Sequence, residues 1–437
     1  MASRRAFEHV QERTSPPTTA RAIAILGTLA LVACTGSDPQ AATTWVEEGL
    51  LPSSAPNYRP RCDEDSTRWL LGEAPALETR GVELDNEGEL VDPVSVSVTS
   101  SGTIVLADRG GATGQRIVIL DSTGAVAEVV GREGEAPGEF RSITWVKPYR
   151  GDSIAVYDGG SLALTILDAH GVFGRRIGVP AGLTAVRTRT APLARFGFAT
   201  VFDDGTLLTY GYPEPIMPES PGPIWLWQAL IRLGPSGAVL DTLGLFPATE
   251  VYWTGYDMRP IPFGRKAILA GTGSMFYYGA ANQYEVFLFD STGAPTRVVR
   301  RRHEASQISP EQKEAYGIWA AELIERTQRG GTATDMVAGL LRTLHFPSTA
   351  PPYSALLVDS EGRLWVEDFR WVSELSPSPS ARPTTWSVFD SQGVWQCVVS
   401  VPARFLVKAV SHGRVYGFEF DSLDVAHLRA YDLEGVR

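Results

Sequence analysis

The hydrophobic residues between positions 94 and 145 fall into short runs rather than helical stripes. The runs cover 94–98, 103–107, 116–120 and 125–130, and they are rich in β-branched residues. Gly, Asp and Ser separate them; Asp and Ser make local turn hydrogen bonds, and Gly takes positive φ without steric cost. This pattern predicts an antiparallel meander of four strands. One meander cannot bury both of its faces, so we expect it to be repeated.

Two series of turns repeat this meander along the chain. One series joins the first and second strands of each unit and always contains Gly, at positions 101–102, 150–151, 204–205, 272–273, 361–362 and 412–413. The other joins the third and fourth strands and ends in Gly three residues after Asp121, Asp168, Gly234, Asp290, Asp390 or Asp432. The two series alternate, and each has six members. The sequence therefore predicts an all-β, six-bladed β-propeller.

The last unit lacks its own fourth strand, because the sequence stops just after the Asp432 turn. An uncovered edge strand invites aggregation. The segment 68–84 is the only strand-like stretch that no unit uses. We expect this N-terminal strand to close the last blade and complete the ring.

A segment at about 305–346 departs from the strand pattern. Ser309 to Gln312 forms a capping box with Pro at the first helical position. We expect one helix from 310 to about 328 and a second over 334–345, which makes a two-helix insert between blades 4 and 5. The apolar stripe of the first helix should then pack over one mouth of the propeller, through Ala315, Ile318, Trp319 and Leu323.

The N-terminus has the features of an export signal. Four Arg precede an apolar stretch at 22–33, which is too short to span a bilayer and suits a signal-peptide core. It ends in a Leu-Val-Ala-Cys sequence that resembles the lipobox of bacterial lipoproteins, which implies cleavage before Cys34 and lipidation of that residue. An ordinary secretory signal with a chance Cys is the alternative. Arg4-Arg5 also leaves open twin-arginine rather than Sec export.

These features divide the chain into a signal peptide at 1–33, a flexible tether at 34–64 and the propeller at 65–437. We expect an exported protein, anchored to a bacterial membrane by its lipid and facing the periplasm or the cell surface. Removing residues 1–33, which carry four Arg and two Glu, takes the net charge from −11 to −13. This acidity opposes nucleic-acid binding and leaves membrane contact to the lipid.

Two further cysteines remain, Cys62 and Cys397. An even pair in an exported chain favours a disulfide, and two free thiols are the alternative. Neither Cys has a His or Cys neighbour at the spacing of a metal site.

The run Gly131 to Phe140, together with the turns above, resembles the six-bladed propeller lipoproteins of bacteria, which are relatives of the NHL-repeat propellers. The likeness covers roughly residues 65–437, and its most specific part is the Pro-Gly-Glu-Phe sequence at 137–140. The resemblance implies the fold and export. It implies no particular activity.

Propellers bind small ligands at one end of the central channel, on loops that follow second strands or join blades. In those loops Arg and aromatic residues would suit carbohydrate, peptide or carboxylate ligands. The structural alternative is that Asp after a second strand caps a turn and that aromatic residues pack between blades. The ligand-facing candidates are Asp108, Arg109, Arg141, Asp158, Tyr210, Tyr278, Glu367, Asp368, Arg370, Arg404 and Asp421.

The sequence contains no nucleophile elbow, zinc-protease motif or nucleotide-binding loop. We therefore favour a monomeric binding or scaffold module for an envelope protein, peptide or carbohydrate, without a cofactor. The alternative is a hydrolase or lyase similar to the propeller lactonases, with an axial metal. The metal would be Ca²⁺ held by carboxylates that follow second strands, namely Asp108, Asp158, Glu367 and Asp421.

Overall fold

The computed structural model describes residues 57, 59–64, 68–79, 90–110, 114–180, 183, 192–327, 342–370, 383–423 and 425–435. All of them belong to one unit, Pro39–Arg437. The expected signal peptide, the lipidation site Cys34 and most of the tether lie outside the described residues.

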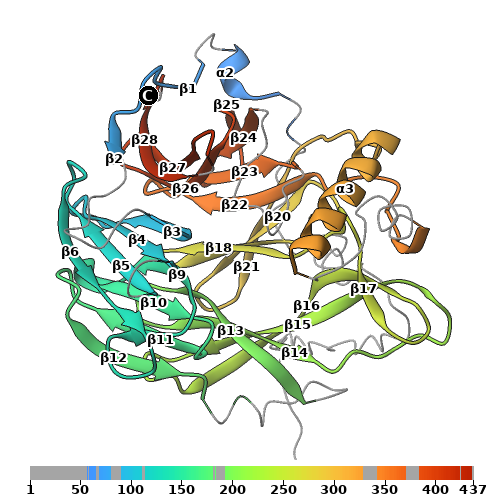
Figure 1. Cartoon of the computed structure of the whole chain (residues 1–437), viewed down its shortest axis with the longest axis horizontal. Coiled ribbons are helices and arrows are strands. Elements are labelled where there is room, and N and C mark those ends of the chain that lie inside the picture. The colour runs from blue at the N-terminus through green and yellow to red at the C-terminus, as the bar shows by residue number, and fades with distance from the viewer. Residues whose placement is uncertain are drawn as a thin grey trace, which may run out of the picture. The chain divides into compact units, whose positions relative to one another are not determined.

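Six antiparallel sheets of four or five strands make up most of the described part of the chain, which confirms the all-β prediction (Figure 1). A two-stranded parallel sheet, β7 (Arg132–Glu133) with β8 (Glu139–Phe140), accompanies them. The first sheet comprises β3 (Pro93–Val98), β4 (Ile104–Asp108), β5 (Arg116–Leu120) and β6 (Val126–Val130). The second comprises β9 (Ile143–Pro148), β10 (Ile154–Asp158), β11 (Ala163–Leu167) and β12 (Phe173–Gly178). The third comprises β13 (Leu193–Val201), β14 (Leu207–Pro213), β15 (Gly222–Leu233), β16 (Val239–Trp253) and β17 (Met258–Pro260). The fourth sheet comprises β18 (Ile268–Thr272), β19 (Met275–Gly279), β20 (Glu285–Asp290) and β21 (Pro295–Arg300). The fifth comprises β22 (Tyr353–Val358), β23 (Leu364–Asp368), β24 (Thr384–Phe389) and β25 (Trp395–Val401). The sixth comprises β26 (Phe405–Ser411), β27 (Arg414–Phe420) and β28 (Ala426–Glu434), together with two N-terminal strands.

The turns between strands have a common construction. In the turn that begins at Asp121, the side-chain Oδ1 accepts the backbone N–H of Thr123 at 2.9 Å and of Ala125 at 3.1 Å. Gly124 closes the turn at a φ of 89°, which a residue with a Cβ adopts only with strain. The Asp168, Asp290 and Asp390 turns repeat these side-chain bonds. Local chemistry therefore fixes where each strand ends.

The hydrophobic core lies between neighbouring sheets. Each of six clusters of buried side chains combines residues of two sheets, and the sixth sheet shares a cluster with the first through Phe418 and Val118. The first strands of neighbouring sheets also make contact, including β26 with β3. Between β9 and β13, Lys147 Nζ donates to Ala199 O at 3.2 Å. The sheets thus follow one another around a closed, propeller-like circuit.

The N-terminal segment covers the edge of β28, as its unpaired edge led us to expect. It makes two short strands rather than one, β1 (Leu70–Leu71) and β2 (Leu77–Thr79), and both pair antiparallel with β28. The rest of the expected strand, from residue 80, lies outside the described residues.

Residues 57 and 59–64, which we assigned to the flexible tether, are bound to the sheets. The Asn57 side chain donates to Arg300 O at 2.8 Å and to Gly393 O at 2.9 Å, and so joins two neighbouring sheets. A short helix, α2 (Arg61–Glu64), follows, and its Cys62 forms a disulfide with Cys397 of β25. Two residues of the segment assigned to the tether, Asn57 and Cys62, are therefore joined to the sheets.

One helix of the insert is described, α3 (Pro310–Thr327) (Figure 1). It begins with the predicted capping box, in which Gln312 N donates to Ser309 Oγ at 3.2 Å and Ser309 N donates to Gln312 Oε1 at 2.9 Å. The second expected helix, 334–345, lies mostly outside the described residues. The predicted stripe of α3 is wrong in two positions, because Ala315 and Ile318 are exposed. The helix instead buries Gly317, Ala320 and Ala321.

Candidate functional site

A cavity of about 450 Å³ lies beside α3, where β22 begins and β23 ends. The segment that connects β17 to β18 forms one wall. Cavities of this volume are typical of small-molecule sites. Its lining mixes apolar and charged side chains, among them Ile261, Phe263, Lys266, Tyr316, Trp319, Tyr353, Ser354, Glu367, Phe369 and Arg370.

Aromatic rings form one wall of this cavity. The Phe263 ring lies 5.9 Å from that of Tyr316 on α3 and 6.3 Å from that of Phe369, which follows β23. The Tyr316 ring is in turn 5.3 Å from Trp319. The insert and two loops thereby present rings on which the flat face of a ligand could stack.

The backbone is strained at two positions in the lining. Phe263 has a φ of 57° and Ala281 a φ of 52°, and neither is Gly. Such conformations are costly and occur preferentially at binding and catalytic sites. Their presence in one cavity supports a ligand site there.

A buried ion pair forms the polar part of the lining. Glu367, the penultimate residue of β23, has Oε1 at 3.0 Å from Arg370 Nε, and these side chains are only 6% and 11% exposed. Ser354 Oγ donates to Glu367 Oε2 at 2.8 Å. Ser354 lies at an irregularity of β22 between Tyr353 and Ala355, and such a bulge re-aims a side chain.

Burial has the largest effect on the pKa values of Glu367, Arg370 and Lys408. It raises the pKa of Glu367 even though the nearby Arg370 guanidinium and the Ser354 hydroxyl favour the carboxylate. It also lowers the pKa of Arg370 and of Lys408 on β26, and the Arg370 charge lowers the Lys408 pKa further. Arg370 Nη1 has no hydrogen-bond partner among the described residues. A ligand could supply one.

A second cavity, of about 340 Å³, lies on the far side of the segment that leads into β22. Its Arg301 guanidinium is held between two rings, 4.2 Å from the centre of Tyr284 and 4.8 Å from that of Trp395. Arg301 Nη1 also lies 3.0 Å from Asp368 Oδ1. Asp368, one of the ligand-facing candidates, therefore forms an ion pair with a residue that follows the neighbouring sheet, and this pair links the two sheets.

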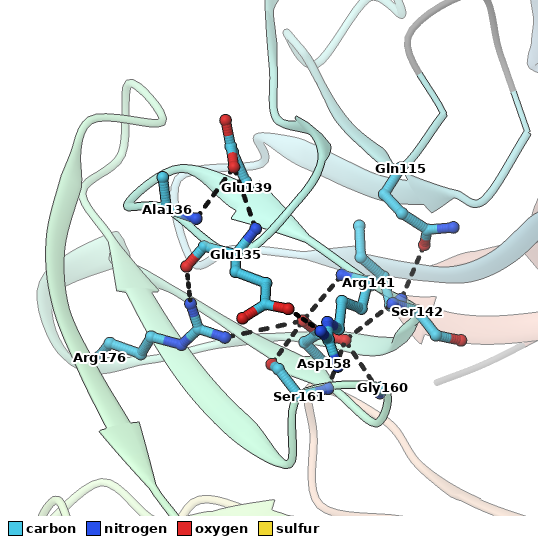
Figure 2. A network of polar contacts seen from close by, with 11 residues as sticks. Gln115, Glu135, Ala136, Glu139, Arg141, Ser142, Asp158, Gly160, Ser161 and Arg176 are labelled. Carbon is cyan, nitrogen blue, oxygen red and sulfur yellow. Dashed lines mark hydrogen bonds and ion pairs between the residues drawn. The ribbon is translucent and has the colours of Figure 1, made fainter.

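Asp108 and Asp158 brace loops at equivalent places in two sheets. Asp108 Oδ1 accepts Asp92 N at 2.7 Å, and its carboxylate pairs with the fully buried Arg116. Asp158 Oδ1 accepts Ser142 N at 2.8 Å (Figure 2). Each carboxylate thus ties the end of a second strand to the chain that leads into the first strand of its sheet.

The network around Asp158 also includes the loop that carries the family resemblance (Figure 2). Arg141 donates its backbone N–H to Asp158 Oδ2 at 3.0 Å, and its guanidinium pairs with Glu135. Glu139 accepts the backbone N–H groups of Glu135 and Ala136 at 3.0 and 2.9 Å. These contacts hold the loop together.

The other candidates lie apart from the cavity lining. Arg109 pairs with Asp92 at the surface, and Arg404 donates from Nε to Phe420 O at 2.8 Å. Asp421 caps a turn, because its side chain accepts hydrogen bonds from Leu423 N and Val425 N. This is the structural role that we gave as the alternative to ligand binding.

Two predicted tyrosines are held within the protein. Tyr278 is fully buried and donates its hydroxyl to Pro247 O at 2.6 Å. Burial raises the pKa of Tyr210 to about 12, and its ring lies edge-on to that of Tyr212. Of the eleven candidates, the structure brings only Glu367 and Arg370 together in the cavity.

The four carboxylates proposed for Ca²⁺ do not converge. Among the described residues, no three His, Cys, Asp or Glu side chains lie close enough together to hold a metal ion. Within the same residues, no helix is long and apolar enough to cross a membrane.

Sequence reasoning missed most of the cavity. Phe263 belongs to a connection between sheets and Tyr316 to the insert, and neither was among the ligand-facing candidates. An aromatic residue in a connection has the same sequence signal whether it packs between sheets or lines a cavity.

No protein-family model and no curated protein matches this sequence. Several solved structures are similar to this chain at low identity. A member of the DUF4221 family from Bacteroides vulgatus is 11% identical with a TM-score of 0.49, over 84% of this chain and 98% of its own. A gluconolactonase from Xanthomonas campestris is 16% identical with a TM-score of 0.37, over 84% and 97%. Virginiamycin B lyase from Staphylococcus aureus is 10% identical with a TM-score of 0.37, over 84% and 100%. These likenesses assign no activity to this chain.

Proposed function

We propose that this chain is an extracytoplasmic binding module that holds a small ligand in the cavity beside α3. Its six sheets would be the blades of a six-bladed propeller, and a lipid on Cys34 would anchor it to a bacterial membrane. The observation that carries the proposal is the buried Glu367–Arg370 pair, which lines a cavity of about 450 Å³ together with the aromatic wall. Convergent polar groups in an otherwise apolar cavity are the usual form of a ligand site.

Part of the cavity lining comes from segments outside the six sheets, namely the α3 insert and the connection between β17 and β18. The α3 insert supplies Tyr316 and Trp319, and the strained Phe263 packs on it. A purely structural envelope protein gives no reason to keep charged groups and strained backbone in a cavity, because both cost stability.

Thermal unfolding of the full chain in detergent, screened against sugars, sugar acids, aromatic acids and short peptides, tests the binding function. We expect at least one compound to raise the melting temperature saturably. Tyr316→Ala should weaken its binding about 10-fold or more, since the variant loses an aromatic surface. Tyr256→Ala is the control, because Tyr256 is 93% exposed on another loop. The proposal would be contradicted if both variants lost the same binding affinity, or if no compound raised the melting temperature saturably. Chemical turnover of the bound compound would favour the enzyme alternative.

The anchor has a separate test. Full-length protein expressed in a bacterial host should partition into membranes and carry the added mass of a diacylglyceryl group. The Cys34→Ser variant should lose both properties. A wild-type protein released without lipid would favour the ordinary secretory signal.

A further inference from the structure

The charged residues that line the cavity beside α3 are Lys266, Glu367 and Arg370, among the residues that the structure describes. Glu367 and Arg370 pair with each other, with 3.0 Å between Oε1 and Nε, and their side chains are only 6% and 11% exposed. Lys266 is exposed to solvent and has an interaction of its own within the protein. The buried part of the lining therefore contributes one positive and one negative charge, which compensate each other.

A further charge in this cavity would be costly. Burial raises the pKa of Glu367 and lowers the pKa of Arg370, so both shifts favour the uncharged forms. Outside the lining, the Lys408 charge lowers the Glu367 pKa and the Asp368 charge raises it, so these two effects oppose each other. A charged ligand would lose its hydration without meeting an uncompensated charge of opposite sign. The electrostatics therefore favour an uncharged ligand.

The ion pair offers a hydrogen-bond donor and an acceptor at one place. Ser354 Oγ donates to Glu367 Oε2 at 2.8 Å, and a carboxylate has about four acceptor sites, so Glu367 keeps acceptor capacity beyond Ser354 and Arg370. Arg370 Nη1 has no hydrogen-bond partner within the described part of the chain. A purely apolar ligand would leave such groups unpaired, which costs free energy. Two neighbouring hydroxyl groups match them, because one accepts from the guanidinium while the other donates to the carboxylate.

The aromatic wall adds a second requirement, a flat apolar face. The Phe263 ring lies 5.9 Å from that of Tyr316 and 6.3 Å from that of Phe369, so three segments supply the wall. A sugar ring presents C–H groups on a face and hydroxyl groups around its rim. It therefore meets the wall and the ion pair with one molecule. An aromatic acid meets the wall but brings the charge that the cavity disfavours.

We infer that the ligand of this cavity is an uncharged sugar, whose neighbouring hydroxyl groups bind Glu367 and Arg370 while its C–H face lies on the aromatic wall. This inference rests on the proposed function and specifies its ligand class. The charge of the sugar is the property that the test must vary, because the ring and most of its hydroxyl groups stay the same in charged derivatives.

Calorimetric titrations of the full chain in detergent make this comparison. Glucose and galactose are the neutral probes, glucuronate and galacturonate are the acids, and glucosamine and galactosamine are the amines. We expect at least one neutral sugar to bind about 10-fold or more tightly than both its acid and its amine. An acid or an amine that binds as tightly as its neutral sugar would overturn the inference. Absence of binding by all six probes would also overturn it, and the proposed function would still stand if the thermal screen yields a compound of another class.

Single variants of the ion pair test whether its balance sets the preference. Glu367→Gln leaves the Arg370 charge uncompensated and should shift the preference toward the acid by about 10-fold. Arg370→Gln leaves the Glu367 charge uncompensated and should shift it toward the amine by a similar factor. A pair that acted only through the fold would weaken binding of the neutral, acidic and amino forms by the same factor, and that result would overturn the inference.

Two further sets of variants complete the test. The double variant Glu367→Gln/Arg370→Gln restores the charge balance, so it should bind more weakly than wild type but still prefer the neutral sugar. Arg414 and Asp432 form an exposed pair at 2.8 Å, with side chains 35% and 56% exposed. The matched controls Arg414→Gln and Asp432→Asn should leave the preference unchanged. A shift of the same size in these controls would assign the effect to the net charge of the protein and overturn the inference.

Discussion

Asp108 and Arg116 form an ion pair from which water is excluded, with Arg116 Nη2 at 2.8 Å from Asp108 Oδ2 and both side chains 0% exposed. The two residues face each other across β4 and β5. Asp108 also accepts backbone N–H groups of the chain before β3, so the pair fixes that loop to the sheet. Asp108, one of the carboxylates that the sequence suggested for a metal or a ligand, is thus a structural brace.

Asp108→Ala should lower the free energy of unfolding by about 3–5 kcal/mol, because it removes the carboxylate that pairs with the buried Arg116 guanidinium. Asp92→Ala, which breaks the exposed pair with Arg109, should cost no more than about 1 kcal/mol. Urea denaturation followed by fluorescence measures both. An equal decrease in the free energy of unfolding for the two variants would contradict this account, in which burial makes the Asp108–Arg116 pair contribute more to stability than the exposed pair.

Asp158 should make stability depend on pH. Burial alone would raise the pKa of this carboxyl, but hydrogen bonds from Ser161, Arg141 and Ser142 bring it below its usual value. The folded state therefore favours the carboxylate. Its contribution is complete above the pKa of an unfolded Asp, about 3.9, and is lost as the pH falls through the lower folded pKa.

Asp158→Asn should therefore cost about 2 kcal/mol at pH 7, since an amide cannot accept all of these bonds. The difference from wild type should shrink below about pH 4, where the wild-type carboxyl also becomes protonated. Denaturant melts at a series of pH values give the difference directly. A cost that does not change with pH would assign the effect to packing rather than to ionisation.

The turn chemistry made much of the fold predictable. Asp121 and Gly124 recur as a pair in most sheets, and each such pair fixes a strand end through bonds within five residues. The edge of β28 likewise pointed to a covering segment. The two-part form of that segment was not predictable, because β1 and β2 pair with β28 through contacts distant in sequence.

The site was harder to predict, for two physical reasons. A carboxylate at a strand end has the same sequence signal whether it braces a loop, as Asp158 does, or lines a cavity, as Glu367 does. The walls of the cavity also come from segments far apart in the chain, and only folding brings Phe263 next to Tyr316. The expected stripe of α3 was wrong because it was chosen by the size of its apolar residues, whereas the helix buries the small Gly317, Ala320 and Ala321.

The Cys62–Cys397 disulfide should stabilise the closure of the ring. It joins residues separated by 335 positions and holds α2 against β25. Replacing both cysteines with Ser should lower the free energy of unfolding by about 2–5 kcal/mol. Dithiothreitol should lower wild-type stability to the same level and leave the double variant unchanged. A reductant effect of equal size on the double variant would contradict this assignment.

The most direct measurement of the central claim is a crystal structure of the protein with the compound that raises its melting temperature most. The account predicts electron density for this compound in the cavity beside α3, with a polar group within hydrogen-bond distance of Arg370 and a flat face on Phe263 or Tyr316. Density for the compound at another surface, with this cavity unchanged, would contradict the account.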